Sequence, residues 1–188
     1  MIFFILFGKI INFSFNNLSF MLNLGMKSNI LIVGLIDEFN KNIAYEISNR
    51  LGVYFLDIKD LIEYEIADRQ NMIDLCGVEY LEKQEYKIIK GVTGFENTII
   101  TISNEIFTKW DAYNIFNDSC IILYLRLEEN EINEYFITAE NKFNLNRIVF
   151  KDRDDYLASH STITINARID SPEKAVKDII KQIERINL

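Results

Sequence analysis

The chain has 188 residues, enough for one domain with a sizeable core, and its 49% hydrophobic and 26% charged residues are typical of a folded domain. Its net charge of −8 excludes nonspecific binding to nucleic acid, because such binding needs a positive surface that displaces counterions. A single histidine and two distant cysteines, Cys76 and Cys120, exclude a zinc knuckle or a disulfide framework and favour reduced, buried thiols in a cytoplasmic protein.

Residues 1–25 form a hydrophobic N-terminal extension in which Lys9 is the only charged residue. Lys9 and several asparagines interrupt it, so it lacks the roughly 20 consecutive apolar residues of a spanning helix. Three interpretations stay open: an over-extended reading frame or disordered tail, an interfacial membrane anchor, and a packed element. We favour the first, expect no stable membrane association, and place the folded domain at residues 26–188.

Residues 29–33 are aliphatic and β-branched, which predicts a strand buried on both faces that ends at Gly34. The following segment has Ile43, Ile47 and Leu51 at helical spacing, which predicts an amphipathic helix ending before Gly52.

Farther along, apolar strands alternate with amphipathic helices. Strands are predicted at residues 53–57, 97–102, 120–125 and 162–166, and helices at 58–67, 78–92, 105–116, 128–136 and from Pro172 onward. Pro172 suits the first position of a helix, with Ser171 as its cap. Helical crossovers between apolar strands predict an α/β fold, a three-layer α/β/α sandwich around a five-stranded parallel sheet.

The turn between the first strand and the first helix has the frame of a phosphate-binding loop. An active loop reads G-x-x-x-x-G-K-[ST], in which backbone N–H groups surround the phosphates and the lysine reaches the terminal ones. The eight positions from Gly34 to Lys41 read GLIDEFNK, so only the first glycine is present. Asp37 and Glu38 stand where an anion would approach.

From residue 29 to the C-terminus the chain resembles the shikimate kinases, a family of P-loop kinases with a fold like that of the nucleoside monophosphate kinases. The resemblance rests on spacing and on seven matching segments: Gly34 to Arg50-Leu51-Gly52, Phe55-Leu56-Asp57, Asp60-Leu61-Ile62-Glu63, Gly77 to Glu82, residues 97–125, Arg153-Asp154-Asp155-Tyr156, and Asp170-Ser171-Pro172-Glu173.

The resemblance implies ATP and Mg²⁺ as cofactors and transfer of phosphate from ATP to shikimate, giving shikimate 3-phosphate. It assigns the nucleotide to Gly34, Asn40, Lys41, Asn42 and Arg153, the last of which would cover the adenine. It places Asp57 at a substrate hydroxyl or as a base, with capping of the following helix as the alternative. It implies no metal site built by the protein alone.

The chain departs from the family pattern at most functional positions. Asn40 replaces the phosphate lysine, Lys41 the Mg²⁺-binding hydroxyl, and Asp37 and Phe39 two loop glycines. In addition, Lys59 replaces an aspartate, Glu82 replaces the substrate-binding arginine, and Ser103-Asn104-Glu105 replaces a glycine triplet. The arginine-bearing lid of the family, between Leu125 and Arg153, is shortened, with Arg147 as its only possible remnant. Lys59 and Glu82, both swapped, are candidates to pair with each other, and Arg153 to pair with Asp154 or Asp155.

Loss of one electrostatic donor to a transition state typically costs about 10²–10³ in rate, and several are replaced here at once. We therefore expect a catalytically impaired or inactive shikimate-kinase-like protein, with ATP and Mg²⁺ as cofactors only if activity is retained. One alternative is an active kinase that uses Lys41 in a rebuilt loop, and another is a scaffold that binds no ligand. The expected ligand is a small molecule of shikimate type. The chain is expected to be a monomer or to bind an unknown protein partner.

Overall fold

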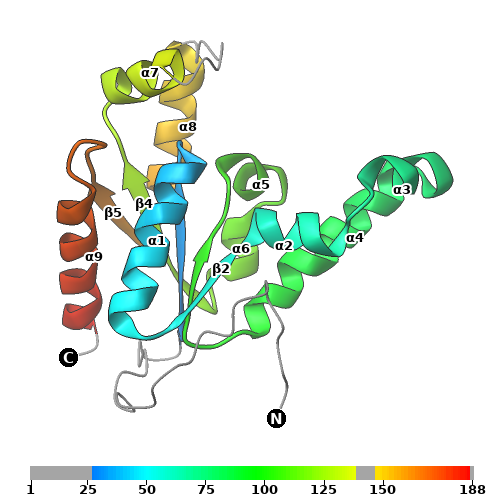
Figure 1. The fold of residues 1–188 in the computed structure, drawn as a ribbon, viewed down its shortest axis with the longest axis horizontal. Coiled ribbons are helices and arrows are strands. Elements are labelled where there is room, and N and C mark those ends of the chain that lie inside the picture. The colour runs from blue at the N-terminus through cyan, green and yellow to red at the C-terminus, as the bar shows by residue number, and fades with distance from the viewer. Residues whose placement is uncertain (1–26, 139–146, 187–188) are drawn as a thin grey trace.

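The computed structural model describes residues 27–138 and 147–186, so the expectations for residues 1–25 lie outside the described part of the chain. Its centre is a five-stranded, all-parallel sheet in the order β2-β3-β1-β4-β5. The strands are β1 (Asn29–Gly34), β2 (Tyr54–Asp57), β3 (Thr98–Thr101), β4 (Cys120–Arg126) and β5 (Ile163–Asn166). Helices lie on both faces of the sheet (Figure 1), which confirms the predicted fold class.

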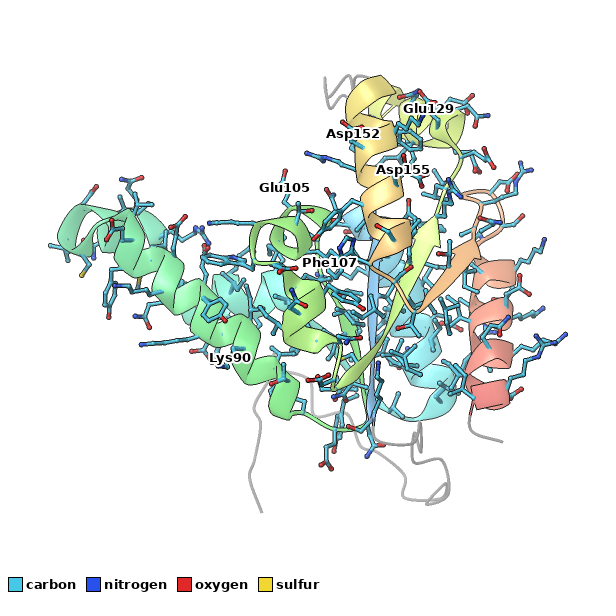
Figure 2. All side chains as sticks on the ribbon, turned by 180° about the vertical axis from the view of Figure 1, so that it is seen from behind. Lys90, Glu105, Phe107, Glu129, Asp152 and Asp155 are labelled. Atoms are coloured by element: carbon cyan, nitrogen blue, oxygen red, sulfur yellow. The ribbon has the colours of Figure 1, made fainter. Side chains whose placement is uncertain are left out.

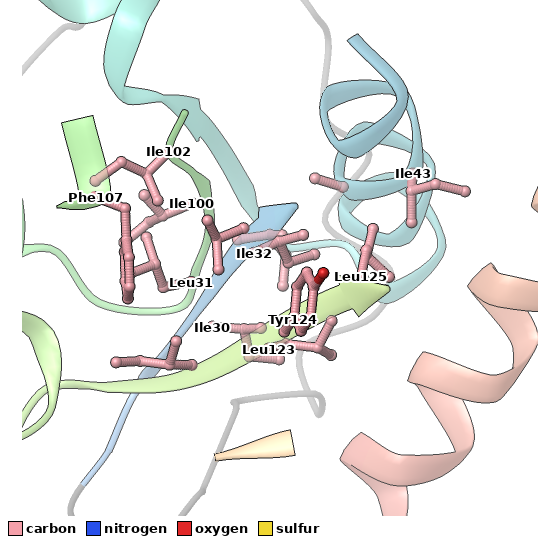
Figure 3. Packing of buried hydrophobic residues seen from close by; sticks show 14 of the residues in the cluster. Ile30, Leu31, Ile32, Ile43, Ile100, Ile102, Phe107, Leu123, Tyr124 and Leu125 are labelled. Atoms are coloured by element: carbon pink, nitrogen blue, oxygen red, sulfur yellow. The ribbon is translucent and has the colours of Figure 1, made fainter. Parts of the chain in front are cut away.

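The central strands β1 and β4 carry the core. Every residue of β1 is buried, as is every residue of β4 except Arg126. In the register, Ile30 pairs with Ile99 of β3 and with Ile121 of β4. Figure 3 shows this cluster with Ile43 contributed by the first helix and Phe107 by a helix of the other layer. Continuous apolar strands are what a sheet covered on both faces requires.

Two long helices cover one face of the sheet. These are α1 (Asp37–Leu51) and α9 (Pro172–Ile186), which lie side by side in Figure 1. Arg50 joins them by donating hydrogen bonds of 3.0 and 2.7 Å to the two carboxylate oxygens of Glu173. The opposite face is covered by α5 (Asn104–Lys109), α6 (Ala112–Phe116) and α8 (Arg147–Ser159), seen toward the viewer in Figure 2. Helix α7 (Glu129–Thr138) follows β4.

The remaining helices form an arm beside β2. They are α2 (Ile58–Glu65), α3 (Arg69–Cys76), α4 (Val78–Gly91) and the short 3₁₀ turn η1 (Val92–Gly94). Helix α3 and the adjoining end of α4 project away from the sheet in Figure 1, and no residue of α3 is buried. The prediction of a buried thiol is therefore wrong for Cys76, which is exposed. It is confirmed for Cys120, where burial raises the thiol pKa to about 11.

Three segments differ from the predicted elements. Helix α3 was not predicted, because its polar first turn indicates an interval between two helices. The single helix predicted at residues 105–116 is divided into α5 and α6, because Asp111 takes a left-handed conformation with φ of 48°. Aspartate tolerates this conformation better than most residues, and it interrupts the helical hydrogen bonds. The third difference is helix α8, for which the sequence predicts only the short motif around Arg153.

Candidate functional site

The segment after β1 turns directly into α1. Only Leu35 and Ile36 separate the two elements, and the Asn40 N–H donates a helical hydrogen bond of 3.1 Å to the Ile36 carbonyl. Leu35, Ile36 and Phe39 are 5%, 2% and 9% exposed, so their side chains belong to the core. The eight residues aligned with a phosphate loop thus consist of the end of a strand, a two-residue turn and the first helical residues.

The start of α1 carries acidic rather than capping residues. Ile36 makes no side-chain cap, and Asp37 and Glu38 occupy the first turn. Their negative charges suit the positive end of the helix dipole. Burial raises the pKa of the Asp37 carboxyl above its ordinary value; repulsion by Asp57 and Glu105 acts in the same direction, against the attraction of Lys59.

Gly34 and Asn40 are in close contact. A Cβ atom on Gly34 would lie 2.5 Å from the Asn40 Oδ1 atom and 2.9 Å from the Leu125 carbonyl oxygen, so no larger residue fits there. Asn40 is 2% exposed, and neither Oδ1 nor Nδ2 has a hydrogen-bond partner among the described residues. An unsatisfied buried amide is uncommon and costs stability, so among the described residues Asn40 is held by packing against Gly34 and not by hydrogen bonds.

Lys41 and Asn42 lie farther around α1. Lys41 Nζ forms a 2.5 Å ion pair with Asp60 Oδ2, and Asn42 Nδ2 donates a 3.5 Å hydrogen bond to Glu38 Oε1. Although burial opposes it, the hydrogen bond to Asp60 and the nearby carboxylates raise the pKa of Lys41. Successive helical residues are about 100° apart, which directs Lys41 away from the position of Asn40.

Asp57 lies at the carboxyl end of β2. Its Oδ1 accepts a 2.9 Å hydrogen bond from the Asp60 N–H and its Oδ2 a 2.6 Å hydrogen bond from the Thr101 hydroxyl. The predicted capping of α2 is therefore present. Asp57 also lines a small notch of about 10 Å³ together with Asp37, Asn40, Lys59, Thr101, Ile102 and Ser103.

Helix α8 is held to the sheet by a buried cluster. Asp154, 4% exposed, accepts hydrogen bonds from the Tyr124 hydroxyl at 2.7 Å and from Arg126 Nε at 2.9 Å. Burial and the hydrogen bond to Asp154 raise the pKa of Tyr124 far above its ordinary value. Arg153 on the same helix donates a 3.0 Å hydrogen bond to Asn104 Oδ1, rather than pairing with Asp154 or Asp155.

A cleft of about 420 Å³ opens beside the notch, between α2, α3, α4 and α5. Asp37, Lys59 and Ser103 line both hollows. The other lining residues are Ile62, Glu63, Arg69, Glu85, Glu105, Ile106, Lys109 and Trp110. Figure 2 places Glu105 on the exposed side of α5.

Most of the positive charge in this cleft is already neutralised. Glu85, buried in α4, pairs with Arg69 and, at 3.4 Å, with Lys109. Glu82 pairs with Lys109 at 3.0 Å, so the predicted partner Lys59 is not used. Arg69, Glu85 and Lys109 are not among the site residues predicted from the sequence. In the sequence, the three-residue spacing of Glu82 and Glu85 places both on one face of the helix, but no local pattern indicates their positively charged partners.

Within residues 27–138 and 147–186, no cluster of three or more histidine, cysteine or acidic residues could hold a metal ion. No helix in this part of the chain has the length and apolar character needed to cross a bilayer.

Comparisons with known proteins identify relatives. The family model described as shikimate kinase matches residues 41–184, a region that begins directly after Asn40. Among solved structures, the shikimate kinase from Acinetobacter baumannii in complex with shikimate has a TM-score of 0.70 at 17% identity, over 86% of this chain and 96% of that one.

Two further shikimate kinases have similar folds. The enzyme from Bacteroides thetaiotaomicron has a TM-score of 0.69 at 15% identity, over 84% of this chain and 98% of that one. The enzyme from Aquifex aeolicus has a TM-score of 0.66 at 19% identity, over 85% of this chain and 98% of that one. Comparison with curated protein sequences gave no match.

Proposed function

Because the chain belongs to the shikimate kinase family, we propose that it is a catalytically impaired member that no longer binds ATP and retains the adjoining cleft for a small molecule. The observation that carries this proposal is the first turn of α1. It begins at Asp37, three residues before the position of the phosphate lysine, and Leu35, Ile36 and Phe39 belong to the core.

The residues present do not fit MgATP. Phosphoryl transfer depends on positioning and on neutralising the phosphate charge, which a phosphate loop does with backbone N–H groups, a lysine and a metal-binding hydroxyl. Here Asn40 is neutral and packed on Gly34, and Lys41 stands where the hydroxyl would be. Asp37 and Glu38 add negative charge at the helix N-terminus, which opposes a phosphate.

The alternative, an active kinase using Lys41, requires that side chain to leave Asp60 and turn toward Gly34. Its 2.5 Å ion pair and its place around the helix favour the impaired form. The redirected Arg153, which bonds Asn104, also supports loss of the nucleotide site, since the family assigns this position to the adenine.

The test combines a binding and an activity measurement. A ligand at 100 times its Kd stabilises a protein by about 2.7 kcal/mol, and each kcal/mol is about 2–4 °C in Tm at this chain length. We expect ATP with Mg²⁺ to leave the Tm unchanged, and a coupled ADP assay with shikimate to show no turnover. Turnover that disappears in Lys41→Ala would establish the alternative instead.

A further inference from the structure

A second pocket, of about 340 Å³, lies between the last two turns of α4 and the junction of α5 and α6. Figure 2 labels one of its residues, Lys90, toward the end of α4 that lies beside the sheet. This α4–α6 pocket shares only Trp110 with the cleft described above and no residue with the notch. Its volume falls in the range of about 300–1,000 Å³ that is usual for small-molecule sites.

Lys90 and Asp111 give this pocket one charge of each sign. Both side chains are exposed and line the pocket, and neither forms an ion pair with the other or with a further residue in the described ranges. Asn114 Nδ2 donates a 2.6 Å hydrogen bond to Asp111 Oδ2, which orients the carboxylate. Because two opposite charges share one pocket without meeting, a molecule that carries both charges can pair with each of them.

The backbone conformation of Asp111 brings its carboxylate and the Trp110 indole to the same pocket. Adjacent residues of a helix point about 100° apart, so two of them do not ordinarily line one small pocket. Asp111 leaves the helical conformation with φ of 48° and ψ of 50°, and both side chains line the pocket. Residues other than glycine in this conformation are concentrated at functional sites.

The rest of the pocket has an apolar wall. Trp110 and Ile115 are half-buried, and the Tyr86 ring lies 5.7 Å from the indole at an angle of 50°. The Lys109 ammonium lies 4.7 Å from the centre of the Trp110 ring, so a cation already occupies part of the indole surface. An uncharged aromatic or aliphatic group is therefore the part of a ligand that suits this wall.

We propose that the α4–α6 pocket binds a free α-amino acid with an aromatic or aliphatic side chain. Lys90 pairs with the ligand carboxylate, Asp111 pairs with its ammonium group, and Trp110 contacts its side chain. The charged lining residues sum to zero, so a simple anion or cation meets one attraction and one repulsion, whereas a zwitterion meets two attractions. This inference is independent of the proposed function, because no residue from Gly34 to Lys41 lines the pocket.

The first test compares three ligands that share one ring: phenylalanine, N-acetylphenylalanine, which has no ammonium group, and phenylalaninamide, which has no carboxylate. They are titrated into the full chain at pH 6, where the free amines are charged. Trp110 is the only tryptophan of the chain, so its fluorescence reports binding at this pocket. We expect phenylalanine to bind about fivefold more tightly than either derivative, the effect of one exposed ion pair.

Two variants assign the charges. Lys90→Gln should weaken phenylalanine about fivefold and leave phenylalaninamide unchanged, because the amide has no carboxylate to lose its partner. Asp111→Asn should weaken phenylalanine by the same factor and leave N-acetylphenylalanine unchanged; asparagine also tolerates the left-handed conformation, so the fold is retained. The matched control is Lys87→Gln, an exposed residue of α4 that does not line the pocket and should have no effect.

One further variant separates this pocket from the cleft, because Trp110 lines both. Lys59→Gln alters only the cleft, and a loss of phenylalanine affinity in that variant would place the amino acid there and overturn the inference. The absence of a saturable fluorescence change with phenylalanine would also overturn it. So would equal affinities for the three ligands, or an unaltered phenylalanine affinity in both Lys90→Gln and Asp111→Asn.

Discussion

Replacement of Phe39 by glycine restores the residue that a phosphate loop has at this position, and we expect it to destabilise the protein strongly. Phe39 is 9% exposed and lies in the first turn of α1. Truncation of a buried phenylalanine to alanine costs about 3–5 kcal/mol, and glycine in a helix adds up to about 1 kcal/mol. The expected loss of about 4–6 kcal/mol is a large part of a typical total of 5–15 kcal/mol.

Urea unfolding followed by circular dichroism measures this loss. A matched control is Tyr45→Gly in the same helix, where the side chain is 51% exposed. Its cost is that of helical glycine and of the lost edge-on ring contact with Phe55, together about 2 kcal/mol. Phe39→Leu, which retains an apolar side chain, should cost about 1–2 kcal/mol. If Phe39→Gly were no more destabilising than Tyr45→Gly, the first turn of α1 would not be part of the core.

Three other outcomes are expected. Asp154→Ala should lower the free energy of unfolding by about 2–4 kcal/mol, because it leaves the Tyr124 hydroxyl buried and unpaired. Tyr124→Phe should lower it by only about 1 kcal/mol. Strictly additive losses in the double variant would contradict this coupling. Asp37→Asn should raise the Tm at pH 7, since a carboxyl with a raised folded-state pKa costs stability once ionised. This gain should vanish as the pH falls below the ordinary value of 3.8, and a gain that persists there would have another cause. Lys41→Ala should change the free energy of unfolding by no more than about 1 kcal/mol, since its pair with Asp60 is exposed; a larger loss would give Lys41 a further role.

The strands and the first helix were predictable because their signals are local. Strand β1 is apolar at nearly every residue, and Ile43 and Ile47 repeat at helical spacing, so burial follows from the pattern itself. Capping of α2 was one of the two roles predicted for Asp57, and its side chain accepts the corresponding hydrogen bond from the Asp60 N–H.

The arrangement of the cleft was less predictable because it depends on contacts distant in sequence. Glu85 meets Arg69 and Lys109 from separate helices, and no local pattern indicates these pairs. The break at Asp111 depends on one left-handed residue, which sequence periodicity does not indicate. The burial of Asn40 was missed for a related reason: a polar residue in a helix is ordinarily assigned to the exposed face, and here Gly34 lies against it.

Calorimetric titration of ATP into the full chain with excess Mg²⁺ shows whether the turn between β1 and α1 still holds a nucleotide. We expect no saturable heat up to millimolar ATP, because Asn40, Phe39 and the acidic first turn occupy or oppose the phosphate position. A Mg²⁺-dependent, one-to-one isotherm with a micromolar Kd would contradict it.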